Sequence, residues 1–141
     1  MAWAQNWPDK AITLVVPFPS GGTTDVLARM VSQKMTETLG QNFIVDNRPG
    51  ATGTIAGAMV AKAPPDGHTL IMHSTSSYTS GYLYRKISYE PARAFAPVIR
   101  AAISGLYIVS IPSLPARNIK EMEALAKTRP KELTYATVGF G

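Results

Sequence analysis

A short apolar strand, a glycine pair and a long amphipathic segment together constrain the fold of this chain most strongly. Residues Ile12 to Val16 are apolar apart from one Thr, and Pro17 ends the run. Gly21-Gly22 follows. Apolar residues then recur at helical spacings up to Gly40, which is suited to a helix C-cap: Leu27, Met30, Val31, Met35 and Leu39. This order predicts a strand, a glycine turn and a helix, with the strand buried on both faces.

The same alternation repeats further along the first half. Phe43-Ile44-Val45 predicts a second short strand, and a small-residue helix is expected around Ile55 to Val60. Pro64 to Gly67 is a strong turn signal, and Thr69 to Met72 predicts a third strand. Strands that alternate with helices imply right-handed crossovers, so the sequence predicts an α/β fold with a mainly parallel sheet.

The second half carries weaker signals of the same kind. Leu106 to Val109 and Leu133 to Val138 are strand-like runs. Between them, Asn118 followed by Glu121 three residues later resembles a capping box, and the helix it predicts stops before Pro130. We therefore expect a strand, a helix and a second strand in this part of the chain.

Composition excludes several classes of protein. The chain has 141 residues and no cysteine, which excludes disulfide scaffolds, thiol catalysis, thiolate zinc sites and iron–sulfur clusters. Its apolar runs are strand-sized and far shorter than the roughly 18 residues that a spanning helix needs. An integral membrane protein is therefore not expected, and no cofactor is predicted.

The net charge of +5 comes entirely from the second half of the chain. Residues 71–141 hold nine basic and four acidic side chains, whereas residues 1–70 hold five of each. The basic residues are spread singly, and no aromatic-rich RNA-binding signature accompanies them. The excess therefore favours attraction of small anions over binding of nucleic acid.

Three predicted loops at the carboxyl ends of strands are rich in Gly, Ser and Thr. In parallel sheets these ends carry the ligand site, and free backbone N–H groups at helix starts suit carboxylate or phosphate. The candidate ligand-binding residues are Phe18, Pro19, Ser20, Gly21, Gly22, Thr23, Thr24, Asp25, Ser74, Thr75, Ser76, Ser77 and Gly139. The alternative, that loops of this type look alike whatever their function, stays open on these residues alone.

Asp25 admits two interpretations. It is the only acid in these loops, so it could bind a ligand ammonium group. An acid in the first turn of a helix also stabilises that helix through its dipole. The sequence slightly favours the second interpretation.

Other chemistry has less support. The GxGxxG and GxxxxGK[ST] spacings are absent, which argues against nucleotide binding. His68 and His73 have no partner at metal-ligand spacing, so no metal site is predicted. No GxSxG elbow surrounds Ser74, Ser76 or Ser77. A small α/β enzyme that acts on an anionic substrate through Ser74 or His73 remains the alternative.

Five motifs, taken in order, resemble the substrate-binding receptors of tripartite tricarboxylate transporters, also called Bug-type receptors. They cover nearly the whole chain from residue 7. One of them departs from the family pattern, because His68 stands where the family has an aromatic residue. The motifs are Trp7 to Asp25, Val45 to Ala51, Ala63 to Leu70, Phe95 to Val98 and Leu133 to Ala136.

The resemblance implies a periplasmic-binding-protein-like architecture of type II, with two α/β lobes that close on a small carboxylate. In the family, backbone N–H groups and ordered waters at the loop matching Phe18 to Thr24 hold the carboxylate, and the loop matching Ser74 to Ser77 adds polar side chains. The receptor presents its ligand to a membrane permease and is not an enzyme. On this basis, residues 1–104 are expected to form the first lobe and residues 105–141 an incomplete second lobe.

The family's chains are much longer than this one, so a fragment, a natural short form or a partner-completed lobe is expected. Ala2-Trp3-Ala4 fits the end of a removed signal peptide, with Met1 added, which predicts a periplasmic location. The exposed edges of a partial sheet would favour pairing with a second copy, as a homodimer or through a domain swap of Leu106 to Gly141.

Overall fold

The structure, a computed structural model, describes residues 7–79, 87–105 and 107–136. Its internal contacts separate two units, with the division between Ile99 and Arg100. Among the described residues, every strand and all but one of the helices belong to the first unit. The predicted site residues of the first two loops therefore lie in the first unit.

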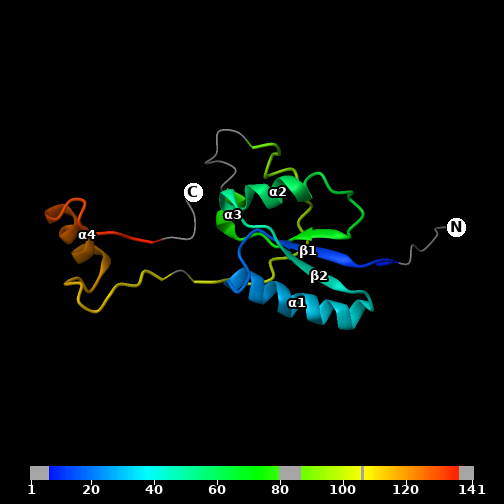
Figure 1. Ribbon diagram of the computed structural model, residues 1–141, viewed down its shortest axis with the longest axis horizontal. Helices are drawn as coiled ribbons and strands as arrows, with labels where there is room; N and C mark the ends of the chain where they lie inside the picture. The colour runs from blue at the N-terminus through cyan, green and yellow to red at the C-terminus, as the bar shows by residue number, and fades with distance from the viewer. Residues whose placement is uncertain (1–6, 80–86, 106, 137–141) are drawn as a thin grey trace. The chain divides into compact units, whose positions relative to one another are not determined.

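A three-stranded parallel sheet in the order β2-β1-β3 organises the first unit (Figure 1). The strands are β1 (Ile12–Val16), β2 (Phe43–Asn47) and β3 (Thr69–Ile71). Leu14 of the central strand lies opposite Val45 on one side and Leu70 on the other. The predicted α/β fold with a mainly parallel sheet is confirmed.

Helices cover both faces of this sheet. The long helix α1 (Thr23–Leu39) packs on β1 and β2, and α2 (Thr54–Val60) packs on β1 and β3. Figure 1 shows the two helices on opposite sides of the strands, as right-handed crossovers require. A short 3₁₀ turn η1 (Ala51–Gly53) precedes α2, and α3 (Thr75–Thr79) follows β3.

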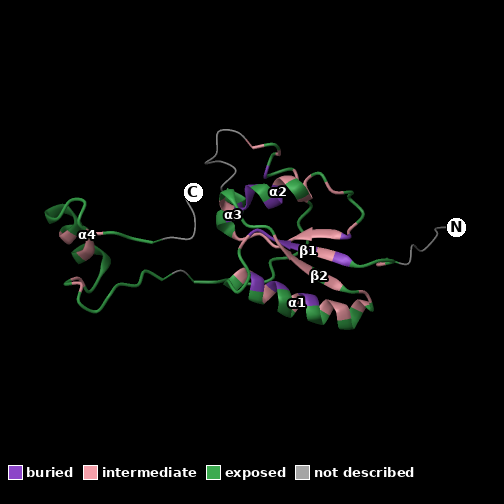
Figure 2. Ribbon diagram, in the orientation of Figure 1, coloured by how far each residue is buried: buried purple, intermediate pink, exposed green. Residues whose placement is uncertain are grey.

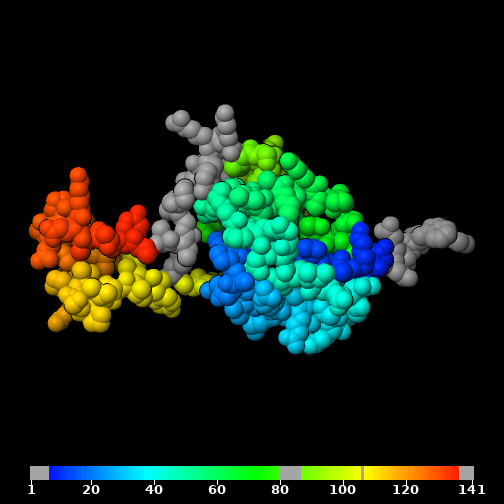
Figure 3. All heavy atoms as spheres, in the orientation of Figure 1, coloured from blue at the N-terminus to red at the C-terminus, as the bar shows by residue number. Residues whose placement is uncertain are grey.

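The core lies around the central strand. Ile12, Val15 and Val16 of β1 are completely buried, and Figure 2 shows the colour of buried residues along β1. Ala28 of α1 and Ala56 of α2 close the two faces, and both are also completely buried. In the space-filling view, β1, α1 and β2 form one continuous mass (Figure 3). A strand buried on both faces was predicted, and it is confirmed.

Helix α1 forms where the apolar spacing predicted it and ends at Gly40, whose N–H donates to Thr36 O at 3.0 Å. Four residues of the predicted apolar stripe, Leu27, Val31, Met35 and Leu39, are half-buried. The buried residues of α1 are Asp25, Ala28 and Ser32, whereas Met30 is 64% exposed. The most deeply buried positions of α1 are therefore small or polar residues that lie beside the half-buried apolar stripe.

The second unit contains α4 (Ile119–Thr128), which begins as the capping-box pattern predicted. Asn118 Oδ1 accepts the Glu121 N–H at 3.0 Å, and Glu121 Oε2 accepts the Arg117 N–H at 2.7 Å. No residue of α4 is buried. Local capping contacts therefore define the start of this helix.

The two strands predicted in the second half are absent from the described residues. Residues 107–109 and 133–136 have no strand hydrogen bonding, so those predictions are wrong there, while 106, 137 and 138 lie outside the described residues. Tyr107, Ile108 and Val109 are 69–88% exposed. An apolar run forms a strand only where a neighbouring strand pairs with its N–H and C=O groups, and none does so within these described residues.

Among the described residues, no helix combines the length and apolar character needed to cross a membrane.

Candidate functional site

The loops that follow β1, β2 and β3 meet at the carboxyl end of the sheet. Gly53, in the loop after β2, shows this most directly, because a Cβ atom built on it would lie 2.7 Å from Ser77 Cβ and 2.9 Å from Pro17 Cβ. Pro17 opens the loop after β1, and Ser77 lies in α3 after β3. All three loops therefore surround one point, as the rule for parallel sheets predicts.

The start of α1 presents backbone N–H groups without protein partners. Gly22 is the N-cap residue, has an extended backbone and offers no side-chain cap. The first helical hydrogen bond runs from Val26 N–H to Gly22 O at 3.0 Å. Within the described residues, the N–H groups of Thr23, Thr24 and Asp25 donate to no protein acceptor, whereas Gly22 closes a hydrogen-bonded turn over Ser20 and Gly21. Unpaired N–H groups at the positive end of a 17-residue helix favour an anion.

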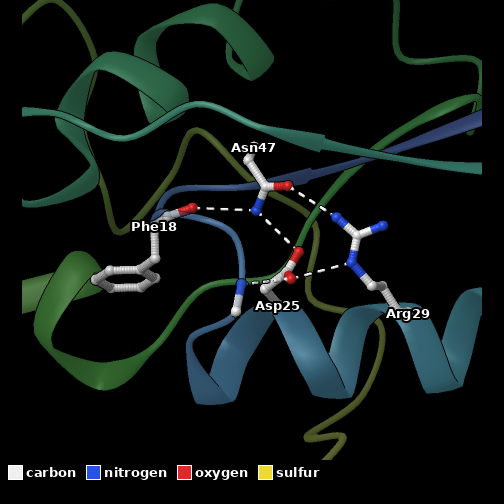
Figure 4. Close-up of polar contacts among 5 residues, drawn as sticks. Phe18, Asp25, Arg29 and Asn47 are labelled. Carbon is white, nitrogen blue, oxygen red and sulfur yellow. Dashed lines mark hydrogen bonds and ion pairs between the residues drawn. The ribbon is translucent and has the colours of Figure 1, made fainter.

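Asp25 closes the loop before α1 through three hydrogen bonds (Figure 4). Its Oδ2 accepts the Gly21 N–H at 2.8 Å and Arg29 Nε–H at 3.0 Å, and its Oδ1 accepts from Asn47 Nδ2 at 2.9 Å. Asn47 Nδ2 also donates to Phe18 O at 3.1 Å. The loop is therefore attached to the end of β2 and to the second turn of α1.

These contacts stabilise the ionised form of Asp25. Hydrogen bonds from Arg29, the Gly21 N–H and Asn47 lower the pKa of the Asp25 carboxyl from 3.8 to about 2, against the opposing effect of burial. Asp25 is only 2% exposed. The carboxylate is thus charged at neutral pH, and its charge is matched by the neighbouring guanidinium.

The loop after β2 has an unusual backbone. Four successive residues have positive φ: Gly50 at 130°, Ala51 at 44°, Thr52 at 53° and Gly53 at 90°. Non-glycine residues rarely adopt this conformation, and such strain persists only where the surrounding structure enforces it. This loop was not among the predicted site residues. The glycines at its two ends were the available sequence signal.

The loop after β3 forms the short helix α3 instead of an open polar segment. Ser77 is completely buried, and its Oγ accepts from the Ser74 N–H at 3.1 Å and lies 2.9 Å from His73 Nδ1. Ser74 Oγ pairs with Ser76 Oγ at 2.8 Å, and Thr75 and Ser76 are exposed. Ser77 therefore holds the loop together, while Thr75 and Ser76 face solvent.

His73 is packed among aromatic rings. Its ring lies 5.0 Å from the Phe95 ring and 6.4 Å from the Tyr78 ring, and burial lowers its pKa from 6.5. Its Nδ1 pairs with Ser77, and Nε2 has no hydrogen-bond partner within the described part of the chain. Among the residues that the structure describes, no acid contacts the ring, and the serine it contacts is buried. This arrangement does not form a nucleophile–base pair with Ser74.

The structure brings most of the predicted site residues to this end of the sheet. The loop from Phe18 to Thr24 is exposed or half-buried, so it is accessible to a ligand. Gly139 lies outside the described residues. Among those described, no group of three His, Cys, Asp or Glu side chains is placed to hold a metal ion. A hollow of about 530 Å³ in the second unit, between Ser110 and Glu121, includes none of the predicted residues.

Comparison with known proteins gives consistent matches. Residues 27–141 match the family described as "Tripartite tricarboxylate transporter family receptor". A relative from Pseudomonas sp. (strain P51), "UPF0065 protein in tcbD-tcbE intergenic region", is 40% identical over 96% of this chain and 40% of its own length. The resemblance drawn from the sequence motifs is confirmed.

Two solved structures are similar in fold as well as in sequence. "R. palustris Rpa4515 with adipate" is 39% identical with a TM-score of 0.72 and covers 90% of this chain. "Structure of periplasmic binding protein BugD" is 35% identical with a TM-score of 0.67 and covers 87% of this chain. This chain covers 43% and 41% of those chains, so it spans less than half of the proteins that it matches.

Proposed function

This chain belongs to the tripartite tricarboxylate transporter receptor family, and from that premise we propose that it binds the carboxylate group of a small organic acid for transport. The observation that carries the proposal is the start of α1, where the N–H groups of Thr23, Thr24 and Asp25 have no protein acceptor within the described residues. Anions bind readily at such helix starts. The adipate named for a 39% identical structure supports a carboxylate as the ligand class.

The proposed contacts come from two loops. Phe18 to Thr24 supplies backbone N–H groups and the Thr23 and Thr24 hydroxyls. Thr75 and Ser76 add hydroxyls from the exposed side of α3, while Ser74 and Ser77 shape that loop. Gly139 is the remaining proposed ligand-binding residue. Residues 1–104 are proposed as the first lobe and 105–141 as the beginning of the second.

The setting follows from the same premise. We propose that the protein works in the periplasm after removal of a signal peptide, and that in its longer form it delivers the ligand to a membrane permease. A 35% identical structure is that of a periplasmic binding protein, which supports this location. We propose a non-enzymatic receptor, because His73 contacts the buried Ser77 and, among the described residues, no acid contacts its ring.

The apolar segment after residue 100 motivates a further proposal about assembly. Ile103, Tyr107 and Val109 are 82–88% exposed, and burying such side chains is strongly favourable. We propose that two copies of this chain pair through this segment, as a homodimer or a domain swap. Size-exclusion chromatography with light scattering tests this, and a monomer of 15.2 kDa would contradict it.

Nuclear magnetic resonance of the ¹⁵N-labelled chain tests the ligand proposal. Adipate is expected to shift the amide signals of Thr23, Thr24 and Asp25, whereas adipamide, which has the same length and no charge, should leave them unchanged. NMR also detects binding of low affinity. Unchanged loop amides at millimolar adipate would contradict the proposal, and turnover of an anionic substrate that disappears in His73→Ala would favour the enzyme.

A further inference from the structure

We infer that Asp25 is a positioning residue: Arg29 and Asn47 hold its carboxylate so that it fixes the loop before α1 and is not available to a ligand ammonium group. This inference rests on the proposed function of the loop and narrows its ligand class. The loop would favour plain carboxylates and give no advantage to amino acids.

The acceptor positions of Asp25 are largely occupied. A carboxylate offers about four lone-pair positions. Three donors, the Gly21 N–H, Arg29 Nε–H and Asn47 Nδ2–H, approach within 2.8–3.0 Å. The residue is 2% exposed, so an ammonium group would have to displace one of these donors and lose its own hydration. Recognition of an ammonium group by Asp25 is therefore unfavourable.

One amide side chain joins both ends of the loop. Asn47 Nδ2 donates to Phe18 O at the beginning of the loop and to Asp25 Oδ1 at its end (Figure 4). Asn47 is in position because it is the last residue of β2 and lies opposite Val16, the last residue of β1. The N–H groups between Phe18 and Asp25 are thus held before any ligand arrives, and such preorganisation strengthens binding.

Arg29 neutralises the negative charge of Asp25 beside the proposed anion site. An unpaired carboxylate beside an anion site would repel a ligand carboxylate. Arg29 Nε lies 3.0 Å from Asp25 Oδ2 on the next turn of α1, and its Nη2 donates to Asn47 Oδ1 at 3.2 Å. The pair is close to neutral, so the loop can use an acid for its shape and still accept an anion.

The first test needs no ligand. Amide hydrogen exchange is measured in the wild-type chain, in Asn47→Ala and in the control Asn42→Ala. Asn42 lies at the opposite end of β2, is exposed, and its side chain forms no hydrogen bond within the described residues. The Gly21 amide is expected to exchange at least about fivefold faster in Asn47→Ala, as loss of a hydrogen bond of about 1 kcal/mol implies, and to be unchanged in Asn42→Ala.

A reference amide separates positioning from general stability. Thr13 N–H, in β1, donates to His68 O at 2.8 Å and reports on the sheet. Its exchange should change less than that of Gly21 in Asn47→Ala. Equal acceleration of both amides would overturn the inference, because Asn47 would then stabilise only the fold. An unprotected Gly21 amide in the wild type would overturn it as well.

The second test compares adipate with 2-aminoadipate, which differs by one ammonium group. In the wild type, 2-aminoadipate should bind no more tightly than adipate, and Asn47→Ala should weaken adipate binding by about threefold to tenfold, the size expected for one hydrogen bond. Tighter binding of 2-aminoadipate that is lost in Asp25→Asn would overturn the inference. Adipate binding that Asn47→Ala leaves unchanged would also overturn it. Absence of adipate binding in the wild type would contradict the proposed function instead, and Gly21 exchange would still decide the role of Asp25.

Discussion

Helices α1 and α4 begin in related ways but are stabilised differently. In each, an acid in the first turn accepts the N–H of the residue four positions earlier: Asp25 from Gly21, and Glu121 from Arg117. At α4 the N-cap Asn118 also accepts the Glu121 N–H, whereas Gly22 at α1 has no side chain with which to do so. The start of α4 is closed by its own sequence neighbours, and that of α1 keeps unpaired N–H groups.

The two acids also differ in burial and in how far along the chain their hydrogen-bond partners lie. Asp25 is buried and held by Asn47, which comes from β2, while Glu121 is exposed and its hydrogen bonds among the described residues go to Arg117 and Asn118. A helix start that binds a ligand cannot use its own N–H groups for capping. Its loop must be held by residues from another part of the fold. In the first unit Asn47 of β2 does so, through hydrogen bonds to Phe18 O and Asp25 Oδ1.

The largest loss of stability is expected from Gly53→Ala, which disturbs the packing at the point where the three loops of the first unit meet. The new Cβ would meet Ser77 Cβ and Pro17 Cβ below 3.0 Å, at a φ of +90°. Overpacking and the left-handed backbone together should lower the free energy of unfolding by about 3 kcal/mol. Urea unfolding followed by circular dichroism measures this.

Gly21→Ala is the matched control. Gly21 has a similar φ of +86° but no atom within 4 Å of the added Cβ, so the loss should be only about 1 kcal/mol. Equal losses in the two variants would show that the loops do not pack closely around Gly53.

Acid should weaken the first unit through Asp25. Because the folded pKa of about 2 lies below the ordinary 3.8, this group stabilises the fold above about pH 4, and the contribution disappears as the pH falls from 4 toward 2. The urea midpoint of Asp25→Asn should therefore depend less on pH in this window than that of the wild type. Glu37→Gln, an exposed acid on the same helix, should retain the wild-type dependence, and a wild-type slope in Asp25→Asn would contradict the assignment.

His73 should cause a milder loss of stability that begins at a higher pH than the loss from Asp25, also as the pH falls. Burial lowers its folded pKa below 6.5, so the unfolded chain binds the proton more readily, and stability should begin to decrease as the pH falls below about 6.5. The measurement is the urea midpoint between pH 5 and 8. In His73→Gln this upper part of the curve should be flat, and a persistent slope would assign it to another group.

Removing the cap of α4 should have a local effect. Asn118→Ala deletes the acceptor for the Glu121 N–H and should cost the helix about 1 kcal/mol. Because no residue of α4 is buried, the loss should appear as reduced helical Cα chemical shifts over 119–128, without a change in the first unit. Lys120→Ala, an exposed neighbour in the same turn, should leave the helix intact.

The smallest change in stability is expected when α1 receives the N-cap residue type of α4, an asparagine in place of Gly22. This variant tests the difference between the two helix starts directly. Gly22 has φ −75°, which any residue adopts, and an added Cβ would be 3.5 Å from Pro19 O. Gly22→Asn should stabilise the helix by a few tenths of a kcal/mol. It should also weaken adipate binding several-fold, because its side chain competes for the N–H groups. Gly22→Ala adds no acceptor and should bind adipate normally, so equal weakening in both variants would contradict the competition.

Much of the first unit could be predicted because its signals are local. The apolar run from Ile12 to Val16 and the glycine at 40 define a strand and a helix end without reference to the rest of the chain. The predicted strands of the second half failed in residues 107–109 and 133–136 for the opposite reason. A strand is stable only with a neighbour to pair with, and apolar character alone does not supply one.

The sequence by itself determined the α/β alternation, the starts of α1 and α4, and the polar character of the loops, since each depends on residues within one or two turns. Only the tertiary structure decided that Asn47 holds Asp25, 22 positions away, and that Gly53 lies between Pro17 and Ser77. These contacts follow from the parallel register that places Asn47 opposite Val16. Register depends on how three separate strands pack together, and no local pattern encodes that choice.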